Sequence, residues 1–273
     1  MSPIGIFDSG YGGLTILESL RQRLPQYDYL YLGDNARAPY GSRSFDVVYE
    51  FTRQAVTKLF DLGCQLVILG CNTASAKALR TIQQNDLPKY DPQRRVLGVI
   101  RPTVEMIGGV TKSRHIGYVA TEGTVRSCSY ELEIAKFYPD IRVTGQACPL
   151  WAAIVEAGEA NTAGADYFVH KRITQLLFND PLIDTIILGC THYPLLMSSL
   201  EKAVPVGTKV IPQGDIIVDS LADYMRRHPD MDARCSKGGT VQFMTTENPE
   251  RFQECARVFL HDKEVHVQHV DLV

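Results

Sequence analysis

The sequence predicts an α/β fold of two similar lobes with mostly parallel sheets, related by a pseudo-two-fold axis. Short runs of branched apolar residues alternate with longer amphipathic stretches, which is typical of strands joined by helices. Segment 4–14, "IGIFDSGYGGL", resembles 116–125, "IGYVATEGTV", and 67–73, "VILGCNT", resembles 186–192, "IILGCTH". The matching segments occur in the same order at similar offsets, which favours two related lobes over chance similarity between strands.

The expected strands are short apolar runs bounded by turn residues. They are 3–7, 28–32, 65–69, 95–99, 115–119, 141–145, 184–188, 209–212 and 265–269. Between them, 45–63 and 163–180 repeat apolar residues at the helical period, and the first of these ends at Gly63. No linker separates the halves, so we expect the chain to cross between lobes more than once. Ligands in such folds bind beyond the carboxyl ends of the strands and in clefts between lobes.

Composition excludes several classes of protein. The 273 residues are 45% hydrophobic and 22% charged, with a net charge of −3, so we expect a globular chain with no nucleic-acid partner. No apolar run approaches the ~18 residues of a membrane span, and "MSPIGIFDSG" is unlike a secretory signal. The seven cysteines include no C-x-x-C pair, which favours reduced cytoplasmic thiols over a zinc site.

Two cysteines occupy equivalent places in the two halves. Cys71 and Cys190 each follow a strand and a glycine, and each precedes an expected helix. Backbone N–H groups and the helix dipole favour an anion there and lower the pKa of a thiol. A lone buried cysteine is more often a small apolar filler, but a matched pair favours reactive thiols.

Such a pair can form a disulfide or transfer protons on opposite faces of one carbon. Proton transfer needs polar partners that set unlike protonation states. Asp8 ends the first strand and is a candidate partner of Cys71, and His192 follows Cys190 by two residues. The ordinary alternatives are a helix N-cap for Asp8 and a hydrogen-bonded core histidine for His192.

Hydroxyl and amide side chains at the other strand ends suit a small zwitterion. These are Ser9, Asn72, Thr73, Thr121, Thr124 and Thr191. The loop 38–44 presents Tyr40 and Ser42, or is an ordinary turn. "SGYGGLT" is not a dinucleotide fingerprint, and no phosphate-binding loop motif occurs. No Schiff-base lysine stands out, so we expect chemistry on a carbon acid without cofactor or metal.

Six segments resemble, in order, the glutamate racemases of the aspartate/glutamate racemase superfamily. They are "IGIFDSGYGGLT", "LGDNARAPYG", "CNTASA", "GTVRS", "ACPLW…VEAGE" and "GCTHYP". "CTHYP" favours glutamate over aspartate racemases, which usually carry an acidic residue after "CT". The resemblance implies cofactor-independent racemisation of L-glutamate and D-glutamate, which supplies D-glutamate for peptidoglycan synthesis. It also implies a homodimer, a first lobe of residues 1–98 plus 208–273, and a second lobe of 99–207.

The resemblance also implies residue roles. Cys71 takes the α-proton from D-glutamate and Cys190 from L-glutamate, and the opposite thiol reprotonates the carbanion. Asp8 assists Cys71, and His192 assists Cys190 with Glu156 as a partner. The expected substrate contacts are Asp8, Ser9, Tyr40, Gly41, Asn72, Thr73, Thr121, Thr124 and Thr191.

Three places depart from the family pattern. Arg101 replaces a usual glutamate, Pro212-Gln213 replaces a usual aspartate-containing turn, and Trp151-Ala152 differs before Glu156. We expect all three to lie away from the two cysteines.

Two other classes of function remain open. One is a related enzyme, such as an aspartate racemase or a decarboxylase. A decarboxylase would need only one of the two cysteines, so the presence of both argues against it. The other is a redox-sensing or amino-acid-binding protein, which would bind without exchange or form a Cys71–Cys190 disulfide. A disulfide needs Cβ atoms within about 4.5 Å. Proton transfer on opposite faces of one carbon places the sulfurs roughly 6–7 Å apart. One closed conformation therefore cannot serve both proton transfer and a disulfide.

Overall fold

The structure is a computed structural model that describes residues 2–260 and 265–272. It contains two sheets, and every strand pairing in these ranges is parallel. The six-stranded sheet has the order β10-β9-β2-β1-β3-β4 and the four-stranded sheet the order β6-β5-β7-β8. The strands of the six-stranded sheet are β1 Ile4–Asp8, β2 Tyr29–Gly33, β3 Leu66–Leu69, β4 Arg95–Gly98, β9 Val241–Thr245 and β10 Val267–His269. The second sheet holds β5 His115–Ala120, β6 Arg142–Ala147, β7 Thr185–Gly189 and β8 Lys209–Ile211.

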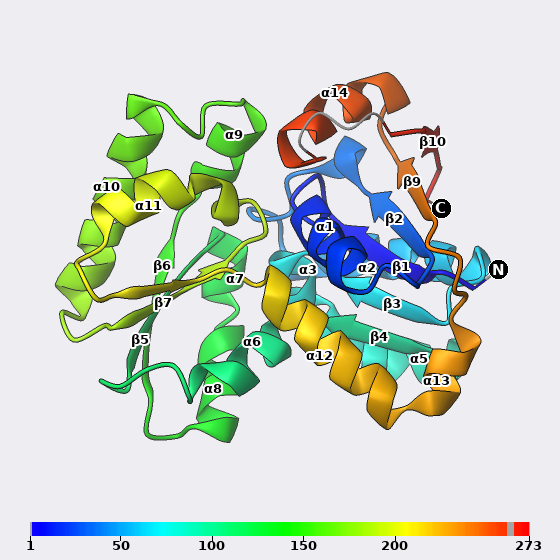
Figure 1. Cartoon of the computed structure of the whole chain (residues 1–273), viewed down its shortest axis with the longest axis horizontal. Coiled ribbons are helices and arrows are strands. Elements are labelled where there is room, and N and C mark those ends of the chain that lie inside the picture. Colours follow the sequence, from blue (N-terminus) through cyan, green and yellow to red (C-terminus); the bar gives the residue numbers. More distant parts are fainter. Residues whose placement is uncertain (1, 261–264, 273) are drawn as a thin grey trace.

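The two sheets repeat one topology. The order β2-β1-β3-β4 in the first corresponds to β6-β5-β7-β8 in the second, so β1 matches β5 and β3 matches β7. Figure 1 shows the two halves side by side, with β5, β6 and β7 in one and the strands from β1 to β4 in the other. The predicted α/β fold of two similar lobes is confirmed.

Two strands differ from the sequence prediction. No strand was expected at β9, because only Phe243 and Thr245 of its five residues are buried and the apolar pattern is weak. It pairs with β10 and with β2, which lies more than 200 residues earlier and aligns in the register Tyr29↔Val241. β8 pairs with β7 in the second sheet, whereas the division above assigns residues from 208 onward to the first lobe. The rest of that division stays a prediction.

Helices cover both faces of each sheet. The predicted helices 45–63 and 163–180 are confirmed as α2 Phe45–Asp61 and α10 Ala163–Asn179. Ser44 begins α2 by accepting a hydrogen bond from the backbone N–H of Val47, and Gly63 follows its end with a φ of 98°. The remaining helices are α1 Leu14–Arg23, η1 Asn35–Arg37, α3 Asn72–Lys77, α4 Leu79–Thr81, η2 Ile82–Asp86, α5 Leu87–Tyr90, α6 Ile100–Ile107, α7 Glu122–Arg126, α8 Ser129–Phe137, α9 Trp151–Glu156, η3 Tyr193–Leu196, α11 Met197–Ala203, α12 Gly214–Arg227, α13 Pro229–Arg234 and α14 Pro249–Leu260.

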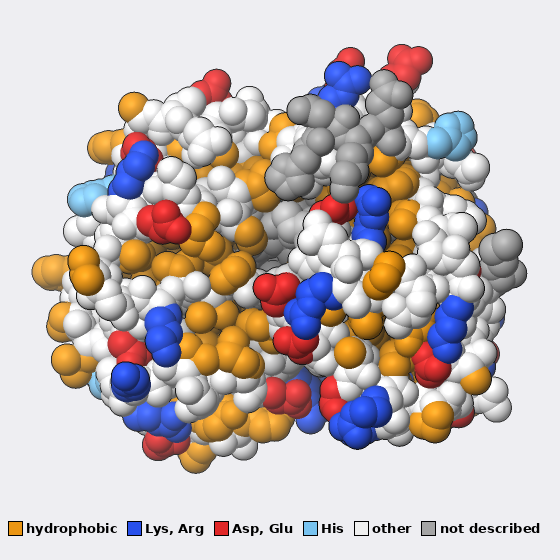
Figure 2. Space-filling view, in the orientation of Figure 1, with side chains coloured by type: hydrophobic (Ala, Val, Ile, Leu, Met, Phe, Trp, Pro, Cys, Tyr) orange, Lys and Arg blue, Asp and Glu red, His pale blue; other side chains and the backbone are white. Residues whose placement is uncertain are grey.

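The core is built from fully buried strands. β1, β3 and β7 are buried along their whole length, as expected for central parallel strands covered on both faces. Ile4 and Ile6 belong to one apolar cluster, and Phe7 belongs to another on the opposite face. On the face drawn in Figure 2, apolar side chains form a broad patch over the lobe that contains β5 to β7. In the described ranges, no helix is both long enough and apolar enough to span a bilayer.

The loops and first helical turns at the carboxyl ends of the two sheets touch across the seam between the lobes. The Gly123 N–H donates to the Gly41 carbonyl at 2.7 Å, and the Thr15 hydroxyl donates to the Thr191 carbonyl at 3.1 Å. The loops after β1, β2, β5 and β7 therefore surround one space between the lobes.

Candidate active site

A cavity of about 560 Å³ lies between the lobes at the carboxyl ends of the strands. Its size suits a small molecule. Every predicted site residue except Thr124 lines it: Asp8, Ser9, Tyr40, Gly41, Cys71, Asn72, Thr73, Thr121, Glu156, Cys190, Thr191 and His192. Among the described residues, no group of three or more His, Cys, Asp or Glu side chains is arranged to hold a metal ion.

Cys71 precedes α3 and is held as a neutral thiol. Its sulfur accepts from the Ala74 N–H at 3.4 Å and lies 3.3 Å from the Ser9 hydroxyl. Burial, followed by the charge of Asp8, raises the pKa of Cys71 to about 12 despite these two hydrogen bonds. The N–H of Ala74 at the start of α3 lowers the pKa of Cys71, as expected, but burial outweighs it, so the net shift is upward.

Asp8 ends β1 and faces the cavity. The N-cap residue of α1 is Gly13 rather than Asp8, but the Gly13 N–H at the start of this helix hydrogen-bonds to the Asp8 carboxyl group. Its Oδ1 accepts from the Gly10 N–H at 2.8 Å. Burial raises the pKa of Asp8, while the nearby His192 and the backbone N–H of Gly10 act in the opposite direction. The carboxyl group is thus held at the strand end between the two halves of the site.

Cys190 has a different set of partners. Its sulfur lies 3.7 Å from His192 Nδ1, and His192 Nε2 lies 2.7 Å from Glu156 Oε1. Burial lowers the pKa of His192, but the hydrogen bonds and charges of Cys190 and Glu156 outweigh it and raise the pKa to about 10. His192 is therefore an imidazolium at neutral pH and attracts negative charge on the Cys190 sulfur. The expected helix directly after Cys190 is absent, since the chain first forms the 3-10 turn η3.

The site thus combines a thiol that burial keeps neutral with a thiol beside a cation. Cys71 carries a proton that it can give, and the Cys190 sulfur lies beside the His192 imidazolium. Both sulfurs reach the same cavity from β3 and β7, which are topologically equivalent.

Gly12 allows the first lobe to approach His192 closely. A Cβ at Gly12 would lie 2.3 Å from Thr191 Oγ1 and 2.5 Å from His192 Nδ1. These distances are too short for any side chain, so glycine is required where this loop meets the loop after β7.

Three threonines bond to one another across the seam. Thr73 Oγ1 lies 2.9 Å from Thr121 Oγ1 and 3.4 Å from Thr124 Oγ1. Thr124 is fully buried and does not reach the cavity wall, so it supports the other two hydroxyls. Tyr40 lines the cavity, but its hydroxyl donates to the carboxylate of Asp34.

The sequence prediction missed several wall residues. Tyr11, Asn35, Glu122, Cys148, Glu247, Arg251 and Cys255 also line the cavity. Arg251 and Cys255 are four residues apart on one side of α14, and Glu247 precedes that helix by two residues. The polar Arg251 on the side of α14 that carries Cys255 was the available signal. Arg251 is the one Lys or Arg among the described wall residues.

The departures from the family pattern lie in different places. Arg101 pairs with Glu105 at 2.9 Å on the exposed side of α6. Ala152 lines the cavity, and Gln213 accepts a hydrogen bond from Asn72, the neighbour of Cys71. The expectation that all three lie away from the cysteines is therefore wrong for Ala152 and Gln213.

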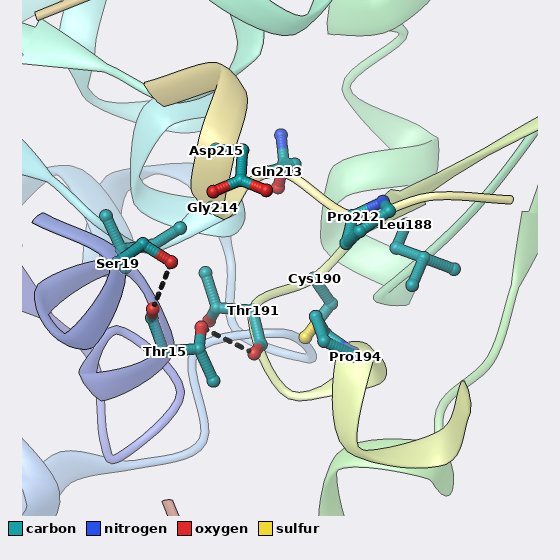
Figure 3. Close-up of a pocket in the computed structure, with 11 residues that line it drawn as sticks. Thr15, Ser19, Leu188, Cys190, Thr191, Pro194, Pro212, Gln213, Gly214 and Asp215 are labelled. Carbon is teal, nitrogen blue, oxygen red and sulfur yellow. Dashed lines mark hydrogen bonds between the residues drawn. The ribbon is translucent and has the colours of Figure 1, made fainter. Parts of the chain in front are cut away.

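A second, smaller cavity of about 130 Å³ lies on another side of Cys190. Figure 3 shows Gln213, Gly214 and Asp215 at one end of it, and Cys190 and Thr191 at the other. The turn before α12 thus lies close to both halves of the candidate site.

Known proteins are similar to this chain in sequence and in fold. The Asp/Glu/Hydantoin racemase family matches residues 14–221. A curated glutamate racemase of Roseobacter denitrificans is 41% identical over 267 residues, which cover 94% of this chain and 96% of the relative. The crystal structure of a Bacillus anthracis glutamate racemase has a TM-score of 0.85 and 32% identity, covering 99% of this chain and 98% of that one. A Francisella tularensis glutamate racemase, solved with D-glutamate, has a TM-score of 0.88 and 31% identity over 99% of this chain and 98% of its own. The chain therefore belongs to the Asp/Glu/Hydantoin racemase family and, within it, to the glutamate racemases.

Proposed function

We propose that the protein interconverts L-glutamate and D-glutamate by moving the α-proton between Cys71 and Cys190. The observation that supports this most is that two buried thiols from equivalent strand ends line one cavity with unlike partners. The similar Francisella tularensis enzyme, whose structure holds D-glutamate, supports glutamate as the substrate.

The proton would follow a direct route. With L-glutamate, the Cys190 sulfur beside the His192 imidazolium takes the α-proton, and the Cys71 thiol gives its proton to the opposite face. D-glutamate leaves with Cys190 protonated and Cys71 as a thiolate beside Ser9. The reverse reaction starts from that state and restores the first. Asn72, Thr73, Thr121 and Thr191 supply N–H and O–H donors for the substrate carboxylates.

The biological setting follows from the family resemblance. We place the reaction in the cytoplasm, where it would supply D-glutamate for peptidoglycan synthesis, and we expect a homodimer. The two sheets with their helices correspond to the two predicted lobes, with the boundary moved past Ile211 so that β8 stays with its partner β7.

The test is α-proton exchange in deuterated water, followed by NMR on D-glutamate, L-glutamate and both isomers of aspartate. The wild-type protein should exchange and racemise glutamate. Cys71→Ala should still exchange L-glutamate and Cys190→Ala should still exchange D-glutamate, with racemisation reduced about 100-fold or more in both. Racemisation that survives in both variants would contradict the two-thiol mechanism. Exchange confined to aspartate would favour an aspartate racemase.

A further inference from the structure

Gln213 connects the crossover between the lobes to the candidate site. It lies in the turn between β8 and α12 and is 2% exposed. Its Oε1 accepts from Asn72 Nδ2 at 2.6 Å. Its Nε2 shares two hydrogens among three acceptors, which include the hydroxyls of Thr103 at 2.8 Å and Tyr130 at 3.1 Å. The Tyr130 hydroxyl in turn donates to Asn72 Oδ1 at 2.8 Å. The side chains of Gln213, Asn72 and Tyr130, which we call the amide ring, thus form a closed circuit of hydrogen bonds.

One backbone carbonyl sets the direction of every bond in the amide ring. Gln213 Nε2 lies 3.2 Å from the Val99 carbonyl oxygen, which can only accept. The Gln213 atom that faces Val99 must therefore be the NH₂ group, and the atom that faces Asn72 must be the oxygen. Because that oxygen can only accept, Asn72 must turn its NH₂ toward it and its oxygen toward Tyr130. The usual ambiguity of amide orientation is removed.

The amide ring contains no ionised group. Thr103 donates its own proton to the Val99 carbonyl at 2.9 Å, so it is free to accept from Gln213. Burial raises the pKa of the Tyr130 hydroxyl far above its ordinary value, so the phenol keeps the proton that it donates to Asn72. The direction of the bonds is therefore the same across the working pH range.

The arrangement leaves Asn72 one donor to spare. Its Nδ2 carries two hydrogens, and the hydrogen bonds of the described residues account for one of them. Asn72 lines the cavity directly after Cys71. We propose that Gln213 is a positioning residue, which acts with Tyr130 to fix the Asn72 amide so that its second N–H faces a carboxylate of the substrate. This inference rests on the proposed function, in which Asn72 contacts glutamate.

Gln213→Glu reverses the polarity with little change of shape. A carboxylate has no donor for Val99 or Thr103, and it attracts the Tyr130 proton away from Asn72. We expect KM for glutamate to rise roughly tenfold, with a smaller change in kcat. Protonation of the introduced carboxylate restores one hydrogen-bond donor. The KM ratio of variant to wild type should therefore fall at least about twofold from about pH 9 to about pH 6.5.

Two further variants make the test specific. Tyr130→Phe removes the donor to Asn72 and should raise KM about fivefold, by the same factor at each pH. Asp215→Asn is the matched control, because it exchanges acid and amide at an exposed position two residues away and should leave KM unchanged. Thermal unfolding midpoints are measured for all three.

The outcomes separate the two proposals. A wild-type protein that exchanges no α-proton of glutamate contradicts the proposed function. If the wild type is active, two results with Gln213→Glu overturn the positioning role. One is an unchanged KM, and the other is a KM ratio of variant to wild type that is the same at each pH. If Gln213→Glu does not fold, Tyr130→Phe decides alone, and an unchanged KM overturns the inference.

Discussion

At the scale of single residues, the two cysteines differ in the charge beside them. Cys71 lies near the carboxyl group of Asp8, and Cys190 lies near the imidazolium of His192. A negative neighbour keeps a proton on sulfur, and a positive neighbour helps to remove one. The two thiols therefore lie in electrostatically unlike surroundings.

The carboxylate of Glu156 maintains the positive charge on His192. Burial alone lowers the pKa of His192, and the contacts with Cys190 and Glu156 raise it to about 10. We expect Glu156→Gln to lower this pKa, so that the alkaline limb of kcat/KM moves to lower pH by about one unit. L- and D-glutamate are enantiomers, so their equilibrium constant is 1 and kcat/KM must be equal in the two directions. The alkaline limb should therefore move equally for L- and D-glutamate.

A matched control distinguishes this effect from a general loss of negative charge. Glu159 is exposed three residues later and does not line the cavity, so Glu159→Gln should keep the wild-type pH profile. A Glu156→Gln variant with an unshifted alkaline limb would show that His192 does not depend on Glu156.

At the scale of elements, the site depends on loops that meet across the seam between the lobes. The loop after β2 carries Gly41, and a Cβ there would lie 2.9 Å from the Thr121 Cβ after β5. Gly41→Ala should push these loops apart and lower kcat/KM about tenfold, with little change in far-ultraviolet circular dichroism.

The control for this change is a glycine with room for a methyl group. A Cβ at Gly164 in α10 would meet only the Thr162 hydroxyl, at an ordinary 3.5 Å, so Gly164→Ala should keep wild-type kinetics. Equal kinetics for Gly41→Ala and Gly164→Ala would refute the close contact at the seam.

Elements with strong local patterns were predictable from sequence. β1, β3 and β7 are buried on both faces and read as continuous apolar runs, and their ends give Asp8, Cys71 and Cys190. β9 was missed because its identity as a strand depends on β2, which lies far away in the chain. Gln213 was misplaced for the same reason: it touches Asn72 across 141 residues, and no local motif records that contact.

At the scale of the whole molecule, the fold holds most of its cysteines as buried neutral thiols. Burial raises the pKa of Cys64 and Cys71 to about 12 and that of Cys235 to about 11, from an ordinary 9.0. Above about pH 9 the unfolded chain loses these protons while the native protein keeps them. Stability should therefore fall as pH rises, by about 1.4 kcal/mol per pH unit for each such thiol, until the native thiols ionise.

Removing one buried thiol should reduce that loss. We expect Cys64→Ala to be less stable than wild type at about pH 8 because it leaves a cavity, yet to lose about 2 kcal/mol less between about pH 9 and about pH 10.5. Urea unfolding under reducing conditions measures both quantities. Cys128 is exposed, so Cys128→Ser should keep the wild-type pH dependence. If Cys64→Ala and Cys128→Ser lose stability in parallel with wild type, the alkaline loss does not come from burial of thiols in the native fold.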